Sequence, residues 1–136
     1  MDPLSRLKNK FQAKDLKFKL KTVSEYKVLQ ILKQLKSKKS FGHDGISSQV
    51  LKIGAKILVI PLTYIINTSI LTGKFPTNWK IAKVTPLYKK GDKKVLKNYR
   101  PVSLLSVSGM VLEKVVANQI EEFFEENNLF IWIQKE

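Results

Sequence analysis

Positive charge is concentrated in residues 85–105, which read TPLYKKGDKKVLKNYRPVSLL. Short apolar runs flank a turn-like KKGDKK, so two strands are predicted over residues 80–88 and 99–105, joined by that turn. The turn would hold Lys89, Lys90, Lys93 and Lys94 close to Arg100. Arginine offers a rigid planar fork that fits phosphate oxygens, and lysine adds a mobile point charge. The spacing suits a phosphate-binding hairpin and a merely solvated turn equally well.

A second candidate site is the loop KSFGHDGIS at residues 39–47. Gly42 and Gly45 would let backbone amides approach an anion, and Asp44 can cap the helix that follows. His43 beside Asp44 suggests a catalytic dyad, but the chain has no cysteine, no second histidine and no recognisable serine-nucleophile motif. We therefore expect no catalytic residue here.

The residue types needed for a metal centre are scarce. Without cysteine and with one histidine, thiolate and histidine-cluster sites are excluded. The aspartates are isolated and none pairs with a second acidic residue, these being Asp2, Asp15, Asp44 and Asp92. No metal site is predicted in this chain.

The net charge of +14 is unevenly distributed along the 136 residues. Residues 1–40 and 41–100 each carry +9, and residues 101–136 carry −4. Such an excess favours a polyanionic partner, because each neutralised phosphate releases counterions. The alternative is a lysine-rich surface that is simply solvated.

Helical periodicity dominates the rest of the chain. Helices are predicted over residues 23–36, 48–58, 61–73 and 108–128. Ser24 and Ser47 suit the N-cap positions of the first two helices, Pro61 suits the first turn of the third, and Gly73 suits its end. The predicted fold class is α+β, dominated by helices that pack on a small antiparallel β-hairpin.

One domain, or part of one, accounts for this length. Residues 1–21 form a basic, loosely ordered lead-in, and residues 22–136 form the domain. The longest apolar stretch, residues 57–66, is interrupted by Pro61 and Thr63 and is shorter than a membrane span needs. The N-terminus lacks an apolar signal core. We expect an intracellular protein, nuclear or cytoplasmic, that makes no membrane contact.

Several blocks in order resemble the reverse transcriptases of non-LTR (LINE-type, jockey-like) retrotransposons. They are KSFGHDGISSQVLK and GKFPTNWKIAKVTPLYKKGDKKVLKNYRPVSLLSVSGMVLEKVVANQIEEFF, with Gln134 near the end. The resemblance covers about residues 22–134. It implies a segment of a transposable-element RNA-directed DNA polymerase, a nucleotidyltransferase with a right-hand fold. The segment would comprise the fingers and the start of the palm.

The resemblance also implies roles for individual residues. Lys89 and Arg100 would contact the triphosphate of an incoming deoxynucleoside triphosphate, with Lys90 a close second. The loop residues Phe41, Gly42, Asp44 and Gly45 would lie along the RNA template. The implied partners are thus nucleic acid (an RNA template and DNA) and deoxynucleoside triphosphates.

The complete family domain uses Mg²⁺ held by clustered aspartates. This chain lacks the Y-x-D-D-type turn, and only two residues follow Gln134. We therefore expect a truncated polymerase fragment that is inactive alone. Two alternatives stay open: a small basic nucleic-acid-binding module without catalysis, and a non-functional retroelement relic.

Overall fold

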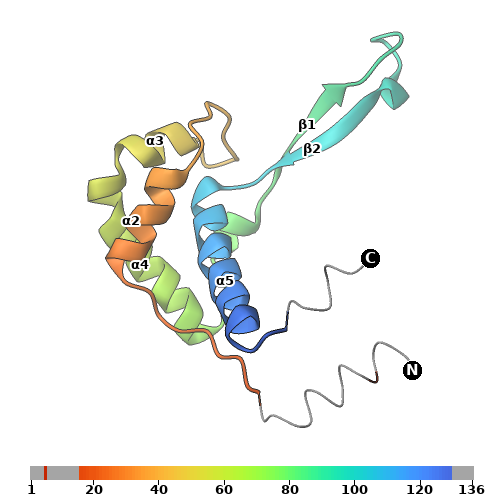
Figure 1. Ribbon diagram of the computed structural model, residues 1–136. Helices are drawn as coiled ribbons and strands as arrows, with labels where there is room; N and C mark the ends of the chain where they lie inside the picture. The colour runs from red at the N-terminus through yellow and green to blue at the C-terminus, as the bar shows by residue number, and fades with distance from the viewer. Residues whose placement is uncertain (1–4, 6–15, 130–136) are drawn as a thin grey trace.

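The computed structural model describes Ser5 and residues 16–129, which form a helical body and one projecting hairpin (Figure 1). The body contains α2 (Glu25–Gln34), α3 (Ser48–Ile53), α4 (Ala55–Thr72) and α5 (Val107–Glu126). The hairpin pairs β1 (Lys83–Tyr88) with β2 (Tyr99–Leu104). Two short 3-10 helices, η1 (Thr77–Lys80) and η2 (Leu96–Asn98), precede the strands. The predicted α+β class, rich in helix with one antiparallel hairpin, is confirmed.

The core lies where α2, α4 and α5 meet. Apolar residues three and four apart on each helix face this junction, as an amphipathic stripe requires. The most deeply buried of them are Val28, Leu32, Ile66, Val111 and Val115. Burying side chains of this size stabilises the fold by about 1.5–3 kcal/mol each.

Serine side chains cap the N-termini of α2 and α3, as predicted. The Ser24 hydroxyl accepts a hydrogen bond from the Lys27 amide at 3.3 Å, and the Ser47 hydroxyl accepts one from the Val50 amide at 3.3 Å. At the other end of α4, Gly73 has φ +66°, the left-handed conformation that suits glycine after a helix.

The predicted break before Pro61 was wrong. The chain instead breaks at Gly54, so α3 is short and α4 runs from Ala55 through Pro61 to Thr72. Pro61 removes one N–H from the helical ladder. Pro61 lies on the exposed side of α4. Water can therefore donate a hydrogen bond to the carbonyl four residues earlier, which the missing N–H would have bonded. Pro61 therefore lies in the interior of α4 and not in the first turn of a helix, as predicted from the sequence.

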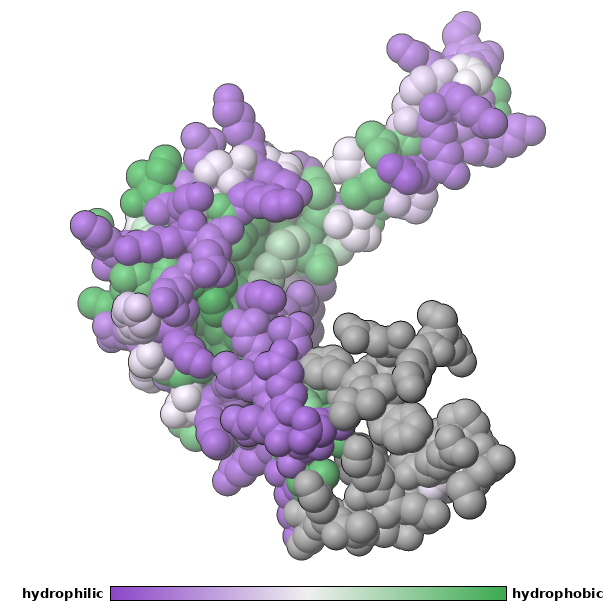
Figure 2. All heavy atoms as spheres, in the orientation of Figure 1, coloured by the Kyte–Doolittle hydropathy of each residue, from purple (hydrophilic) through white to green (hydrophobic). Residues whose placement is uncertain are grey.

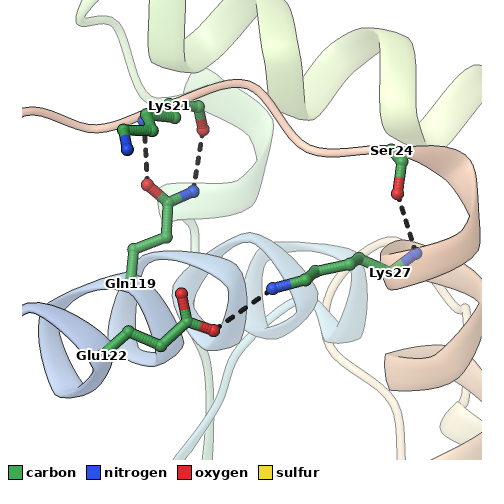
Figure 3. Close-up of polar contacts among 5 residues, drawn as sticks. All are labelled: Lys21, Ser24, Lys27, Gln119 and Glu122. Atoms are coloured by element: carbon green, nitrogen blue, oxygen red, sulfur yellow. Dashed lines mark hydrogen bonds and ion pairs between the residues drawn. The ribbon is translucent and has the colours of Figure 1, made fainter. Parts of the chain in front are cut away.

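An extended segment, residues 16–24, lies across the helical body (Figure 3). The Gln119 side chain on α5 accepts a hydrogen bond from the Lys21 amide at 2.8 Å and donates one to the Lys21 carbonyl at 2.7 Å. Asn67 on α4 bonds both backbone groups of Val23 in the same way, at 2.8 and 2.9 Å. Phe18 packs edge-on against Phe123, with 5.3 Å between the ring centroids.

The structure describes the C-terminal part of the predicted lead-in. Its last residues, 16–21, belong to this bound extended segment, and Ser5 is the only other lead-in residue described. The predicted domain boundary near residue 22 stays a prediction. The apolar stretch LFIWI at residues 129–133 lies outside the described residues apart from Leu129, which is buried.

The prediction that the helices pack on the hairpin was wrong. Every residue of β1 is exposed, and the hairpin leaves the body only at its base (Figure 1). A two-stranded sheet with both faces in water gains little from burial, so its own cross-strand contacts must hold it together. This geometry makes the hairpin an arm.

Gln119→Ala should release the extended segment. It removes both hydrogen bonds to Lys21, which should lower the free energy of unfolding by about 1 kcal/mol and let the backbone of residues 16–24 detach far enough for trypsin to cleave at its lysines. Limited proteolysis and chemical denaturation would measure this. Glu122→Gln is the control, because it removes only the exposed 3.2 Å ion pair with Lys27. Equal cleavage rates in the two variants would contradict this assignment.

Candidate nucleic-acid interface

The strand register assigns each hairpin side chain to one of two faces. Leu87 pairs with Arg100, and Pro86 pairs with Pro101. Beyond the strand ends, the Lys89 amide donates to the Asn98 carbonyl at 2.8 Å, so that position is a hydrogen-bonded pair. Alternation then puts Pro86 and Pro101 on a non-hydrogen-bonded pair, where the missing N–H groups would have pointed outward. Both strands thus accept proline without losing a bond between them.

Three cations share one face of the hairpin, which we call the cationic face: Lys83, Lys89 and Arg100. Lys83 and Lys89 are six positions apart, so alternation puts them on the same face, and Arg100 lies opposite Leu87 between them. At about 3.3 Å per residue, the face extends roughly 20 Å along β1. Lys89 and Arg100 are exposed, and hydrophilic side chains cover the end of the arm (Figure 2). The two predicted triphosphate contacts therefore share a face.

The opposite face of the hairpin is apolar and aromatic. Tyr88 and Tyr99 meet edge-on across the strands, with ring centroids 5.6 Å apart. The Lys93 ammonium lies 5.7 Å from the centroid of Tyr88. Aromatic pairs of this kind and a cation over a ring each stabilise a hairpin by about 0.5–1 kcal/mol.

Side-chain hydrogen bonds to backbone carbonyls hold the turn of the hairpin. The Tyr88 hydroxyl donates to the Gly91 carbonyl, the Asn98 amide to the Asp92 carbonyl at 2.8 Å, and the Tyr99 hydroxyl to the Lys93 carbonyl at 2.8 Å. Gly91 has φ +92°. The Lys94 amide donates a hydrogen bond to the Asp92 carboxylate at 2.9 Å. Lys90 is exposed beside Gly91.

The second predicted site, the loop at residues 39–47, is packed against the start of α5. A Cβ on Gly42 would lie 2.9 Å from the Leu105 carbonyl carbon and 3.0 Å from the Ser106 nitrogen. The Asp44 carboxylate accepts hydrogen bonds from the Ser106 hydroxyl at 2.7 Å and from the Ile46 amide at 3.1 Å. It also places a negative charge beside the N-terminus of α5, which has no acidic residue in its first turn. Gly42 and Asp44 therefore hold the loop in place.

Phe41 and Gly45 have different surroundings in the same loop. Phe41 is 43% exposed, and the Lys83 ammonium lies 4.8 Å from its ring centroid. Gly45 is exposed, and its φ of +71° is a conformation that favours glycine. The Lys83–Phe41 contact joins the loop to the cationic face of the hairpin.

Two residues of this arrangement escaped the sequence analysis. Lys83 could have been found by counting alternate strand positions back from Lys89. Ser106 gave no signal, because its partner Asp44 lies 62 residues away in the sequence.

No metal centre is apparent in the described part of the chain. Residues 16–129 bring together no group of three histidine, cysteine, aspartate or glutamate side chains. The described residues thus offer no ligand set for the Mg²⁺ that polymerase chemistry would need.

The chain is similar to curated proteins of retrotransposons. It is 28% identical over 111 residues to a probable RNA-directed DNA polymerase from transposon BS of Drosophila melanogaster, covering 81% of this chain and 12% of that protein. It is 35% identical over 95 residues to a putative 115 kDa protein in the type-1 retrotransposable element R1DM of the same species, covering 68% and 9%.

The RNA-directed DNA polymerase from mobile element jockey of Drosophila melanogaster is 28% identical over 102 residues, covering 74% of this chain and 11% of that protein. The chain is a relative of non-LTR retrotransposon reverse transcriptases. This finding confirms the resemblance seen in the motifs. The chain spans about a tenth of the length of these relatives, and no protein-family model matches it.

Gly42→Ala should destabilise the protein more than Gly45→Asn. The added methyl would collide with the backbone at Leu105 and Ser106, which cannot move aside as a flexible side chain could, so we expect a loss of about 1–3 kcal/mol. At Gly45 nothing lies within 4 Å of a Cβ, and asparagine tolerates the left-handed conformation. Thermal unfolding would compare them. A Gly42→Ala protein as stable as the unmodified chain would contradict the packing described.

Proposed function

We propose that this chain is the fingers segment of a non-LTR retrotransposon reverse transcriptase and that its hairpin arm holds phosphate. Lys89 and Arg100 contact the triphosphate of the incoming deoxynucleoside triphosphate, and Lys90 contributes from the turn. The RNA template passes the loop at residues 39–47. The observation that carries the proposal is that Lys89 and Arg100 share the face that leads to Phe41 through Lys83.

The chemistry of the face suits phosphate oxygens. Arg100 lies on a strand immediately before Pro101, whose ring restricts the backbone, so the guanidinium starts from a defined place. The segment that leads from the turn into β2 is held by two side chains. The Asn98 amide donates to the Asp92 carbonyl, and the Tyr99 hydroxyl donates to the Lys93 carbonyl. Less side-chain and backbone freedom is then lost on binding than for lysines of a mobile loop.

The loop residues divide into two roles in this proposal. Phe41 offers an exposed ring on which a template base can stack, and Gly45 leaves an open backbone surface. Gly42 and Asp44 act indirectly, because they fix the loop on the start of α5. The described residues supply binding and positioning, and no chemical step is assigned to them.

A second candidate is a nucleic-acid-binding module that does not recognise nucleotides. The exposure of both hairpin faces supports it, since a free basic arm can lie along any nucleic-acid backbone. A competition experiment separates the two functions. A deoxynucleoside triphosphate should displace RNA from a triphosphate site at concentrations where sulfate of equal ionic strength does not, whereas a module without such a site should lose RNA equally to both.

Arg100→Ala and Lys89→Ala should each weaken RNA and triphosphate binding more than Lys94→Ala, although all three remove one charge. Charge-assisted contacts contribute about 1.5–3 kcal/mol, which corresponds to a loss of roughly tenfold or more. An exposed lysine outside the face should contribute about 1 kcal/mol or less. Fluorescence anisotropy with labelled single-stranded RNA, repeated across a salt series, measures these losses.

The salt series adds a second readout. A variant that loses a single-strand phosphate contact should lower the slope of log K against log salt by about 0.7. If the three variants lose equal affinity and equal slope, the lysines and arginine contribute only a diffuse field, and the specific site is wrong.

A further inference from the structure

α4 exposes large apolar side chains on the side opposite the core. Ile57, Ile60, Tyr64 and Leu71 are 79%, 59%, 74% and 75% exposed, whereas Val59, Leu62 and Ile66 on the inner side are buried. We call these four exposed residues the outer stripe. Apolar residues are also visible along the edge of the body formed by α3 and α4 (Figure 2). A helix with apolar side chains on both sides is usually buried by protein on both sides.

The spacing within the outer stripe favours another helix as its cover. Successive members are three, four and seven residues apart, which is the a and d pattern of a heptad. At 100° per residue, the stripe is roughly 60° wide, and the exposed polar residues Lys56, Thr68 and Thr72 border it. By length and composition α4 also passes as a membrane-crossing helix, although a core helix of a soluble protein passes the same test. A narrow seam between polar borders suits a helical partner better than a lipid surface.

The two ends of the outer stripe lie symmetrically about Tyr64. Ile57 and Leu71 each lie seven residues from Tyr64. Two antiparallel copies of α4 related by a two-fold axis at Tyr64 would therefore place Ile57 of each copy against Leu71 of the other. A two-fold interface requires such self-complementarity. We propose that the outer stripe is a homodimer interface, with a second copy of this chain as its occupant.

The surface beside the stripe has a matching hollow. A hollow of about 320 Å³ lies next to α4, and its lining includes Tyr64, Thr68 and Thr72. In the antiparallel arrangement, position 68 lies opposite position 60. Ile60 of the second copy thus enters this hollow as a knob enters a hole.

Electrostatics agree with the antiparallel direction. α4 has no basic residue in its last turn, so a cation from a second copy can lie beside its C-terminal carbonyls. Antiparallel pairing places Lys56 of one copy beside Thr72 in the last turn of the other. A cation at a helix C-terminus is stabilising. Parallel pairing would instead put the two Lys56 side chains next to each other.

Sedimentation equilibrium of the full 136-residue chain tests the proposal, with Tyr64→Lys as the variant and Leu96→Lys as the control. Tyr64→Lys places two ammonium groups together on the axis, so the dimer dissociation constant should rise by at least about a hundredfold. Leu96 is 88% exposed on the hairpin, outside the stripe, so its replacement should leave the constant unchanged. Far-UV circular dichroism checks that both variants fold.

Cross-linking tests the direction, because the chain contains no cysteine and single cysteines can be introduced cleanly. With a short bis-maleimide, Tyr64→Cys should cross-link to itself. Ile57→Cys should cross-link in a mixture with Leu71→Cys, and not alone. Leu96→Cys should give no dimer.

Three results would overturn the proposal: a chain that is monomeric at several hundred micromolar, a dimer unaffected by Tyr64→Lys, or a monomer that binds anionic lipid vesicles through the stripe. The last would assign the surface to a membrane. None of these results depends on whether the hairpin binds nucleotides.

Discussion

The close contact between Gly42 and the Leu105–Ser106 backbone is the constraint on which the arrangement of the candidate site depends. It brings the loop at residues 39–47 against the point where β2 ends and α5 begins, and the Asp44–Ser106 hydrogen bond closes the same junction. Because every residue of β1 is exposed, this junction and the Lys83–Phe41 contact are important for how the arm is placed relative to the loop. A side chain at position 42 would separate the two parts of the proposed phosphate-binding surface.

Local chemistry made much of the fold predictable. Ser24 and Ser47 as N-caps and Gly73 as a helix end depend on neighbours within a few residues, and all three were found from the sequence. The break at Gly54 instead of Pro61 was missed, because packing of Ala55 and Val59 into the core outweighs the hydrogen bond that an interior proline removes. The loop and hairpin were found as separate motifs. Their junction was not, since Asp44 and Ser106 are distant in sequence and only the folded chain brings them together.

Charge and apolar surface are segregated in this molecule. The cationic face occupies the arm, whereas the outer stripe occupies α4 on the helical body. No acidic residue occurs between positions 45 and 91, so no acidic side chain of α4 lies beside the stripe. A polyanion and a second apolar helix can thus be bound by different elements. The proposed nucleotide contacts and the proposed dimer interface are therefore separable by mutation.

The most direct test of the central claim, that the triphosphate of a nucleotide lies on the cationic face of the hairpin, is methyl NMR of the folded chain with a spin-labelled deoxynucleoside triphosphate. Leu87 and Val102 present their methyl groups on the cationic face, and Val84 presents its own on the opposite face, one register position from Val102 along the arm. The account predicts that the label broadens the Leu87 and Val102 signals strongly and the Val84 signal much less. Equal broadening on both faces, or stronger broadening of Val84, would contradict it.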